Sequence, residues 1–182
     1  MTTTQAHILY NWTPHHRGQF QLHSRVHRHS EAMEVTFELK GSTSQLSLRP
    51  HKGGQRCDDL WKDTCFEVFF HHSSSTSNQY WEINCAPNGD WNFYHLDDYR
   101  QNLKSEKLGQ VQLTLFEIQP DQLRIAFKIE GPISEELQLA ATAVIKTLDG
   151  TVSYWSTCIA DNKPDFHLKS IRTLKLLNEG SR

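Results

Sequence analysis

The sequence predicts an all-β fold, an antiparallel β-sandwich of the immunoglobulin-like or jelly-roll-like kind. Three observations carry this prediction. Apolar and polar residues alternate with a period of two along several short segments, turn-forming residues separate these segments, and the periodicity of an amphipathic helix is nearly absent. Many short strands joined by turns favour two packed antiparallel sheets over a fold with helical layers.

Length and charge set the broad class of the protein. A chain of 182 residues is expected to form one domain, residues 1–182, that buries its own core. Its 19 basic and 21 acidic residues give a net charge of -2, which supplies no broad positive field for nucleic acid or an anionic membrane. The start has no export signal, and no run approaches the length of a membrane span. We therefore expect a cytoplasmic protein, without nucleic-acid or membrane partners, whose four cysteines are mostly reduced thiols.

The expected strands follow from alternation. Residues 33–40 alternate most regularly, because Val35, Phe37 and Leu39 lie on one side of an extended chain and polar residues on the other. Further strands are expected at residues 45–49, 111–118, 123–129, 140–148 and 151–157. The turn-forming QPDQ and Asp149-Gly150 sequences predict two hairpins within this series. Weak helical patterns occur at residues 96–103 and 134–137.

Two more strands flank the polar run 71–79, which is expected to be a mobile hairpin loop. The simplest register that matches their apolar faces places Phe66, Val68 and Phe70 beside Trp81, Ile83 and Cys85. Glu67, Glu82 and Asn84 then share the opposite face of the hairpin. The next segment adds Trp91, Phe93 or Tyr94 nearby.

Acids, an amide and aromatic rings on one face are typical of a sugar site. The axial C–H groups of a pyranose pack on an indole, and its vicinal hydroxyls match the paired polar atoms of a planar carboxylate or amide. Trp61 could supply the platform, and Glu67 and Asn84 the polar contacts. The alternative is structural: Glu67 accepts hydrogen bonds at a strand end, and Trp61 packs as a core aromatic residue.

The run from Asp58 to Phe70, continued by YWEINCAPNGDW and later by YWST and KPDFH, resembles the DOMON-like superfamily, specifically domains similar to the type 9 carbohydrate-binding module. The resemblance covers most of the chain, and KPDFH resembles a subgroup of bacterial members. It implies a β-sandwich. In sugar-binding members it implies a ligand clamped between two tryptophans and held by acidic, amide and arginine side chains.

The resemblance also suggests roles for individual residues. Trp61 matches the first tryptophan, Glu67 the acid, and Asn84 the amide of the following strand. Glu82 stands where sugar-binding members carry an arginine, so the cationic donor is missing from its expected place. Trp155 and Phe166 are the two candidates for the second stacking aromatic residue.

A pair of acids has electrostatic consequences. Two neighbouring carboxylates raise one another's pKa or recruit a cation, such as calcium, Arg49 or Arg56. Related domains that bind calcium do so structurally, which makes calcium a possible cofactor. The candidate ligands are Asp58, Asp59, Asp63, Asp97 and Asp98, although solvated turn aspartates are the commoner explanation.

Other functions stay open at this point. Some DOMON-like domains hold haem through a methionine and a histidine, and Met33 is the single internal methionine. Asp165 and His167 beside Cys158 or a serine would suit a hydrolase, yet their spacing identifies no nucleophile. The eleven histidines show no ligand spacing typical of a metal site. The preferred hypothesis is binding of a small polar ligand, a saccharide, without turnover, and the main alternative is a structural or protein-interaction sandwich.

Overall fold

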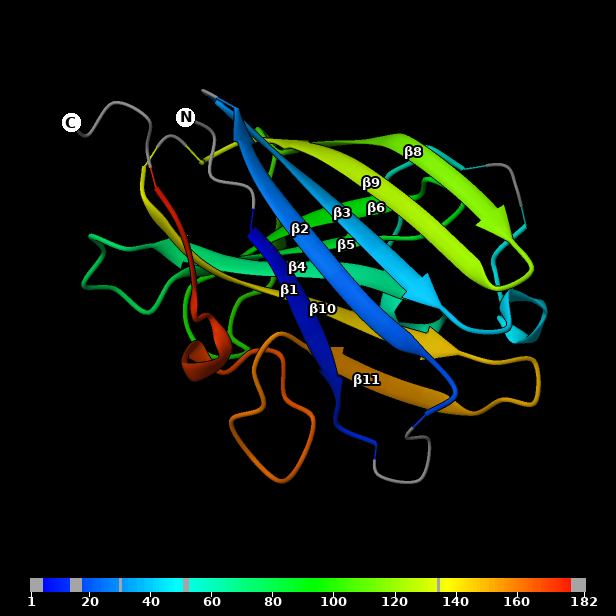
Figure 1. Cartoon of the computed structure of the whole chain (residues 1–182). Helices are drawn as coiled ribbons and strands as arrows, with labels where there is room; N and C mark the ends of the chain where they lie inside the picture. The colour runs from blue at the N-terminus through cyan, green and yellow to red at the C-terminus, as the bar shows by residue number, and fades with distance from the viewer. Residues whose placement is uncertain (1–4, 14–17, 30, 51–52, 134, 178–182) are drawn as a thin grey trace.

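The computed structural model describes residues 5–13, 18–29, 31–50, 53–133 and 135–177, and it is the antiparallel β-sandwich that the sequence predicts (Figure 1). The first sheet contains, in spatial order, β1 (Gln5–Asn11), β2 (Gln21–His29), β3 (Ala32–Lys40), β9 (Gln122–Glu130) and β8 (Gln110–Gln119). The second sheet contains β7 (Lys104–Ser105), β6 (Trp91–Leu96), β5 (Tyr80–Cys85), β4 (Cys65–His72), β10 (Leu137–Lys146) and β11 (Val152–Ser156). A short strand, β12 (Leu174–Leu176), also pairs with β10.

Strand β1 joins the two sheets. Its first part pairs with β2 and its end pairs with β11, so the chain turns the corner of the sandwich within one strand. In Figure 1 the strands β2, β3, β9 and β8 pass in front of β4, β5, β6 and β10, and the two layers enclose the main core. The rings of Phe37 and Phe66 meet there across the sheets with centroids 4.9 Å apart.

The hairpin that carries the predicted acidic face has the predicted register. Phe66 lies opposite Cys85, Val68 opposite Ile83, and Phe70 opposite Trp81. Glu67 and Asn84 face one another across the same pair of strands. On β6, Tyr94 shares the face of Glu82, whereas Trp91 and Phe93 belong to the main core.

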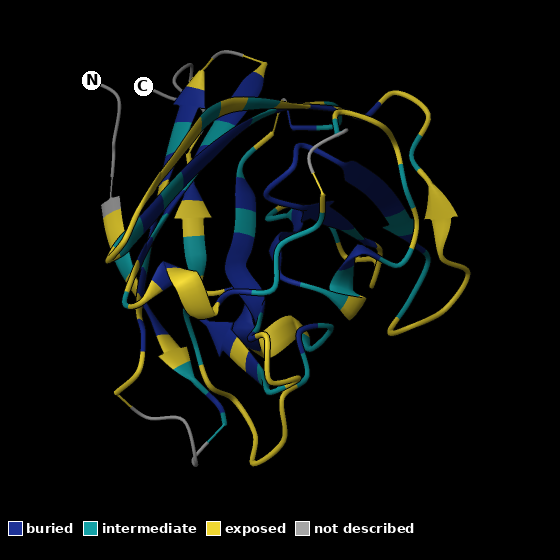
Figure 2. Cartoon of the chain, turned by 90° about the vertical axis from the view of Figure 1, so that its right-hand side faces the viewer, coloured by how far each residue is buried: buried dark blue, intermediate teal, exposed yellow. Residues whose placement is uncertain are grey.

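Both faces of β4 are buried, because the second sheet has a covered outer face as well as a core face. The segment 157–173, with the 3-10 turn η4 (Lys169–Ile171), packs over it together with Trp12. The buried members of this outer cluster are Trp12, Phe69, Tyr80, Tyr94, Leu96, Ala140, Val144, Phe166 and Ile171. In Figure 2 the buried residues follow the strands, while many exposed residues lie in the connecting turns. A polar residue on the outer face of β4 or β5 is therefore enclosed rather than solvated.

Several expected elements differ in the structure. Residues 45–49 are no strand: the 3-10 turn η2 (Thr43–Gln45) is followed by a single bridge from Leu46 to Thr147. Leu96 ends β6, and residues 97–103 contain a bend and a turn that a bridge between Asp98 and Gln101 closes, instead of a helix. Residues 135–137 lead into β10, and residue 134 lies outside the described residues. Among the described residues, no helix has the length and apolar character needed to span a bilayer.

Candidate ligand-binding site

A cavity of about 350 Å³ lies on the outer face of the second sheet. Its floor consists of buried side chains from β4, β5 and β6, one wall comes from the covering segment 157–173, and its mouth is lined by exposed side chains that follow β6. The lining residues are Trp61, Glu67, Phe69, Glu82, Leu96, Arg100, Leu103, Phe166 and His167. Two carboxyl groups thus meet several apolar side chains in one small space.

Trp61 reaches the cavity from a 3-10 turn, η3 (Leu60–Lys62). Asp59 precedes the turn with a φ of 63°, a left-handed conformation that aspartate tolerates better than most residues. Leu60 anchors the turn in the interior, whereas Trp61 is half-buried and packs edge-on against Tyr94 with ring centroids 6.1 Å apart. The indole therefore lies at the border of the outer cluster, where a ligand can reach it.

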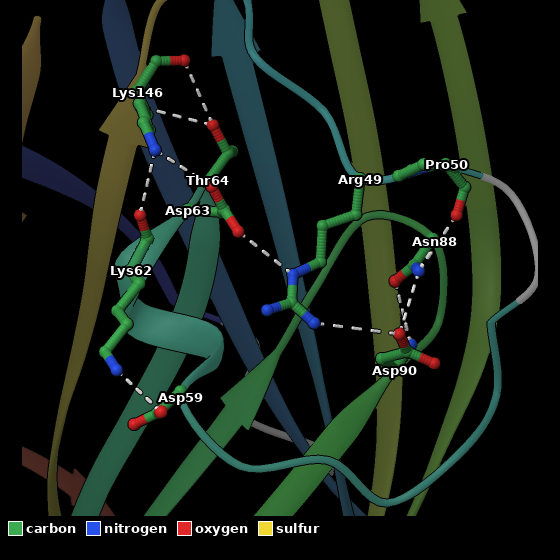
Figure 3. A network of polar contacts seen from close by, with 9 residues as sticks. All are labelled: Arg49, Pro50, Asp59, Lys62, Asp63, Thr64, Asn88, Asp90 and Lys146. Carbon is green, nitrogen blue, oxygen red and sulfur yellow. Dashed lines mark hydrogen bonds and ion pairs between the residues drawn. The ribbon is translucent and has the colours of Figure 1, made fainter. Parts of the chain in front are cut away.

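A polar network holds this turn in place (Figure 3). Asp63, at the end of η3, accepts hydrogen bonds from Arg49 Nε at 3.2 Å and from Lys146 Nζ at 3.0 Å. Burial alone would raise the pKa of Asp63, but the hydrogen bonds from Lys146 and Arg49 outweigh it and lower the pKa. Lys146 Nζ also donates to the carbonyl of Lys62, which ties the turn to β10.

Glu67 lies in the floor of the cavity and is 2% exposed. Its Oε2 accepts a hydrogen bond from the Thr142 hydroxyl at 3.2 Å. Burial and the nearby Glu82 carboxyl raise the pKa of Glu67 well above its usual value. Burial therefore favours the protonated form of this side chain, which can donate a hydrogen bond as well as accept one.

Glu82 is the second acid of the floor. Its Oε1 accepts a hydrogen bond from Asn84 Nδ2 at 2.8 Å. Burial raises the pKa of Glu82 to about 7, although the Asn84 hydrogen bond and the charge of Arg100 act in the opposite direction. Oε2 of Glu82 and Oδ1 of Asn84 are buried, and neither has a hydrogen-bond partner within the described part of the chain. A buried acceptor without a hydrogen bond lowers the stability of the fold and is rare in native proteins, so these two atoms point to a functional role for this part of the sheet.

His167 faces Glu82 from the covering segment. Its Nε2 lies 3.9 Å from Glu82 Oε2, and its Nδ1 lies 2.7 Å from the hydroxyl of Tyr80. The Tyr80 hydroxyl also accepts a hydrogen bond from the backbone N–H of Arg100 at 3.2 Å. Burial, followed by the positive charge of Arg100, lowers the pKa of His167 to about 4, so the imidazole is neutral at neutral pH.

Two arginines supply the positive charge around the cavity. Arg100 lines the mouth and donates to Asp165 Oδ1 at 3.0 Å. Arg172 is buried, lies 4.2 Å from the ring centroid of Tyr80, and donates from Nη2 to the backbone carbonyl of His167 at 2.9 Å. Arg172 therefore contacts both Tyr80 and His167, although it is not itself one of the residues that line the cavity.

Four of the six sequence-predicted site residues line the cavity, namely Trp61, Glu67, Glu82 and Phe166. Asn84 lies on the same face of the sheet, and its amide contacts the Glu82 side chain. Trp155 lies elsewhere: it is 4% exposed in the main core between the sheets, and its indole N–H donates to Ser153 Oγ at 2.9 Å. Of the two candidates for the second aromatic residue, Phe166 alone is at the cavity.

The sequence did not indicate three other lining residues, Phe69, Arg100 and His167. Phe69 could have been found, because alternation places it on the Glu67 face of β4. Arg100 and His167 lie in irregular segments, where no periodicity indicates the direction of a side chain.

The cations expected beside the acid pair lie elsewhere. Arg49 contacts Asp63 and Asp90, and Arg56 stacks over Trp91 at 4.3 Å from the ring centroid. Each of the five aspartates considered for calcium accepts hydrogen bonds from its own partners. These are Asn92 and Tyr94 for Asp58, Lys62 for Asp59, Arg49 and Lys146 for Asp63, Lys104 and Asn102 for Asp97, and Asn78 for Asp98. Within the described residues, no group of three acidic, histidine or cysteine side chains is arranged to hold a metal ion.

The haem and hydrolase hypotheses depended on Met33 and on Asp165 with His167. Met33 is fully buried in the main core between the sheets. Asp165 accepts hydrogen bonds from Tyr99, Arg100 and the backbone N–H of His167. His167 contacts Tyr80 and Glu82, and over the described ranges no serine or cysteine side chain hydrogen-bonds to it.

A larger cavity, of about 970 Å³, lies at a different place, between the end of the first sheet and the segment that follows β7. Three of its charged lining residues have polar contacts: Lys128 pairs with Glu130, and Glu106 accepts hydrogen bonds from the indole N–H of Trp81 and from the backbone N–H of Leu108. It is an open hollow with exposed walls, such as Leu108 at 82% exposure. The smaller cavity is the better candidate site because Glu82, one of its lining residues, carries a buried oxygen atom that lacks a hydrogen-bond partner within the described residues.

Comparison with known proteins shows a likeness to a solved structure. Neither the family models nor the curated proteins include a match to this chain. Among solved structures, the chain is similar to one described as a "putative carbohydrate-binding protein from Bacteroides uniformis ATCC 8492", with a TM-score of 0.63, 10% sequence identity, and coverage of 93% of this chain and 84% of that chain. At this identity the likeness shows a shared fold.

Proposed function

We propose that residues 1–182 form a DOMON-like domain similar to the type 9 carbohydrate-binding module, and that its cavity binds a saccharide without chemical turnover. The observation that carries the proposal is one cavity in which Trp61 and Phe166 accompany the buried carboxyl groups of Glu67 and Glu82. The description of the Bacteroides uniformis protein as carbohydrate-binding supports the same ligand class.

The chemistry of the lining suits a sugar. Aromatic and aliphatic side chains can pack against the C–H face of a pyranose, while carboxyl oxygens bind hydroxyl groups at the ring edge. A volume of about 350 Å³ is at the small end of ligand sites, which favours one or two sugar rings. Burial raises the pKa of Glu67, and in its protonated form this acid can donate to a sugar oxygen without placing a charge in the cavity.

Calorimetric titration with methyl glycosides of glucose, galactose, mannose and xylose, and with cellobiose and maltose, tests the proposal. We expect heat of binding with at least one of these sugars. Trp61→Ala removes the platform and Glu67→Leu removes both oxygens at similar volume, so each should weaken binding about tenfold or more. Tyr10→Ala, at an exposed aromatic residue of β1 outside the cavity, is the matched control and should bind as the wild type does. Silence with every sugar would contradict the proposal.

A further inference from the structure

Glu82 and His167 form a pair of polar groups that the fold itself leaves incomplete. Glu82 Oε2 is buried and lacks a partner in the described structure, and His167 Nε2 faces it at 3.9 Å, beyond hydrogen-bond distance. Both residues line the cavity. The sequence pattern gave His167 no part in ligand binding.

The hydrogen bonds of Tyr80 determine which nitrogen of His167 carries the proton. The Tyr80 hydroxyl accepts from the Arg100 N–H, so its own proton needs an acceptor, and His167 Nδ1 is 2.7 Å away. If Nδ1 carried the proton instead, the buried Tyr80 O–H would be stranded, because no other acceptor contacts it within the described residues. The neutral imidazole therefore carries its proton on Nε2, which faces Glu82.

We propose that His167 and Glu82 together recognise one hydroxyl group of the bound saccharide, with His167 Nε2–H donating to the hydroxyl oxygen and the hydroxyl proton donated to Glu82 Oε2. This inference rests on the proposed function and adds the chemical group that is recognised. An oxygen about 2.8 Å from both atoms would see them at an angle of about 90°, which is close to the separation of the donor and acceptor directions of a hydroxyl.

The pair discriminates between ligand groups. An ammonium group only donates, so it would leave His167 Nε2–H unpaired, whereas an ether oxygen only accepts and would leave Oε2 of the ionised Glu82 unpaired. A carboxylate or a phosphate dianion has no proton to offer Glu82 Oε2, and the ionised Glu82 carboxylate would repel it. A hydroxyl group satisfies both partners at once. The site is therefore specific for uncharged polyhydroxy compounds, and one hydroxyl position should matter more than the others.

Monodeoxy sugars provide the test. The probe is the sugar of the calorimetric panel that binds wild type most tightly, compared with its deoxy analogues. Wild type should lose about tenfold or more in affinity for one deoxy position. His167→Phe should bind the parent sugar more weakly than wild type does, and it should distinguish the sugar from that analogue less well, because only the contact of the hydroxyl with Glu82 remains. His167→Gln, whose amide can place an N–H near the Nε2 position, should restore most of the discrimination.

A measurement without ligand covers the case in which His167→Phe folds poorly. The ¹⁵N chemical shifts of the His167 ring report which nitrogen is protonated, and we expect Nε2–H with an unprotonated Nδ1. Tyr80→Phe removes the hydroxyl that fixes this arrangement, so the two ring forms should then mix. A ring protonated on Nδ1 in wild type would overturn the inference.

The outcomes separate the two proposals. If wild type binds a sugar through Trp61 but His167→Phe discriminates the deoxy analogues as wild type does, the hydroxyl assignment is wrong and saccharide binding stands. If no sugar binds wild type, the proposed function fails and the inference fails with it. Loss of discrimination in His167→Phe with recovery in His167→Gln supports both.

Discussion

Asn84 donates a hydrogen bond from Nδ2 to Oε1 of Glu82 at 2.8 Å, and both side chains are buried on the outer face of the second sheet. This contact holds an acid in the cavity floor at a place where burial opposes its ionisation. Glu67, His167 and Arg100 also line the cavity that Glu82 faces.

The raised pKa of Glu82 predicts a pH-dependent stability. In the folded state the carboxyl keeps its proton up to about pH 7, whereas the unfolded chain loses it near 4.5. The folded state thus binds the proton more tightly than the unfolded chain does. The contribution of this proton to the free energy of unfolding is complete below pH 4.5 and is lost as the pH rises through 7. Glu82→Gln should raise the free energy of unfolding at pH 8 by up to about 3 kcal/mol and should change it little at pH 4.

Urea unfolding of wild type and Glu82→Gln at both pH values measures this difference. Glu117→Gln, at an exposed glutamate of β8, is the control and should show no such pH-dependent gain. An equal effect of Glu82→Gln at pH 4 and pH 8 would argue against the raised pKa.

The two tryptophans should respond differently to removal. Trp155 is buried in the main core, so Trp155→Ala should lower the free energy of unfolding by about 3–5 kcal/mol. Trp61 is only half-buried, and Trp61→Ala should cost no more than about 2 kcal/mol. Chemical denaturation measures both. A larger loss for Trp61→Ala than for Trp155→Ala would mean that Trp61 is a core residue and no ligand platform.

The network around Asp63 should link stability to ligand binding. Asp63→Asn weakens the contacts with Arg49 and Lys146 and should lower the free energy of unfolding by about 1 kcal/mol at pH 7. Because the folded pKa of Asp63 is lowered, its stabilisation is present above the unfolded value of 3.8 and is lost as the pH falls further. The variant should therefore differ less from wild type at pH 3.

Sugar affinity should fall in Asp63→Asn too, since the η3 turn that carries Trp61 loses its anchor (Figure 3). Asp98→Asn, at an aspartate outside this network, is the control. Unchanged affinity in a measurably destabilised Asp63→Asn would show that the turn needs no such anchor.

Sugar affinity should also depend on pH. A hydroxyl donates more strongly to an ionised carboxylate than to a neutral acid, so affinity should rise as the pH passes through about 7 and Glu82 ionises. His167 stays neutral over this range, because its pKa is about 4. Calorimetry at pH 6 and pH 8 measures the effect, and Glu82→Gln should remove the dependence. Equal affinity at both pH values in wild type would count against Glu82 as the acceptor.

The hairpin could be predicted in detail because alternation with a period of two assigns each residue to a face. Once Phe66 and Ile83 are placed in the core, Glu67 and Asn84 must share the other face, and the structure confirms it. That this outer face would be covered was harder to foresee. The cover comes from the irregular segment 157–173, whose path depends on tertiary contacts such as Trp12 against Phe166.

The errors have physical reasons. Leu46 and Leu48 alternate with polar residues as in a short strand. In the structure Leu46 directly follows a 3-10 turn, forms a single bridge and is buried, so an alternation of only two apolar residues did not suffice to predict a strand. The expected strand 151–157 exists, yet its pattern does not say which face meets the core. Trp155 therefore looked equally suited to a cavity and to the interior, and it lies in the interior.

Chemical-shift mapping by NMR with the sugar that binds most tightly tests the central claim most directly. Saccharide binding should shift the indole N–H of Trp61 and the backbone amides of Glu67, Glu82, Arg100 and His167, all at the cavity, and leave the indole N–H of Trp155 unchanged. Shifts confined to the larger hollow around Glu106 and Lys128, or no shifts at saturating sugar, would contradict the account.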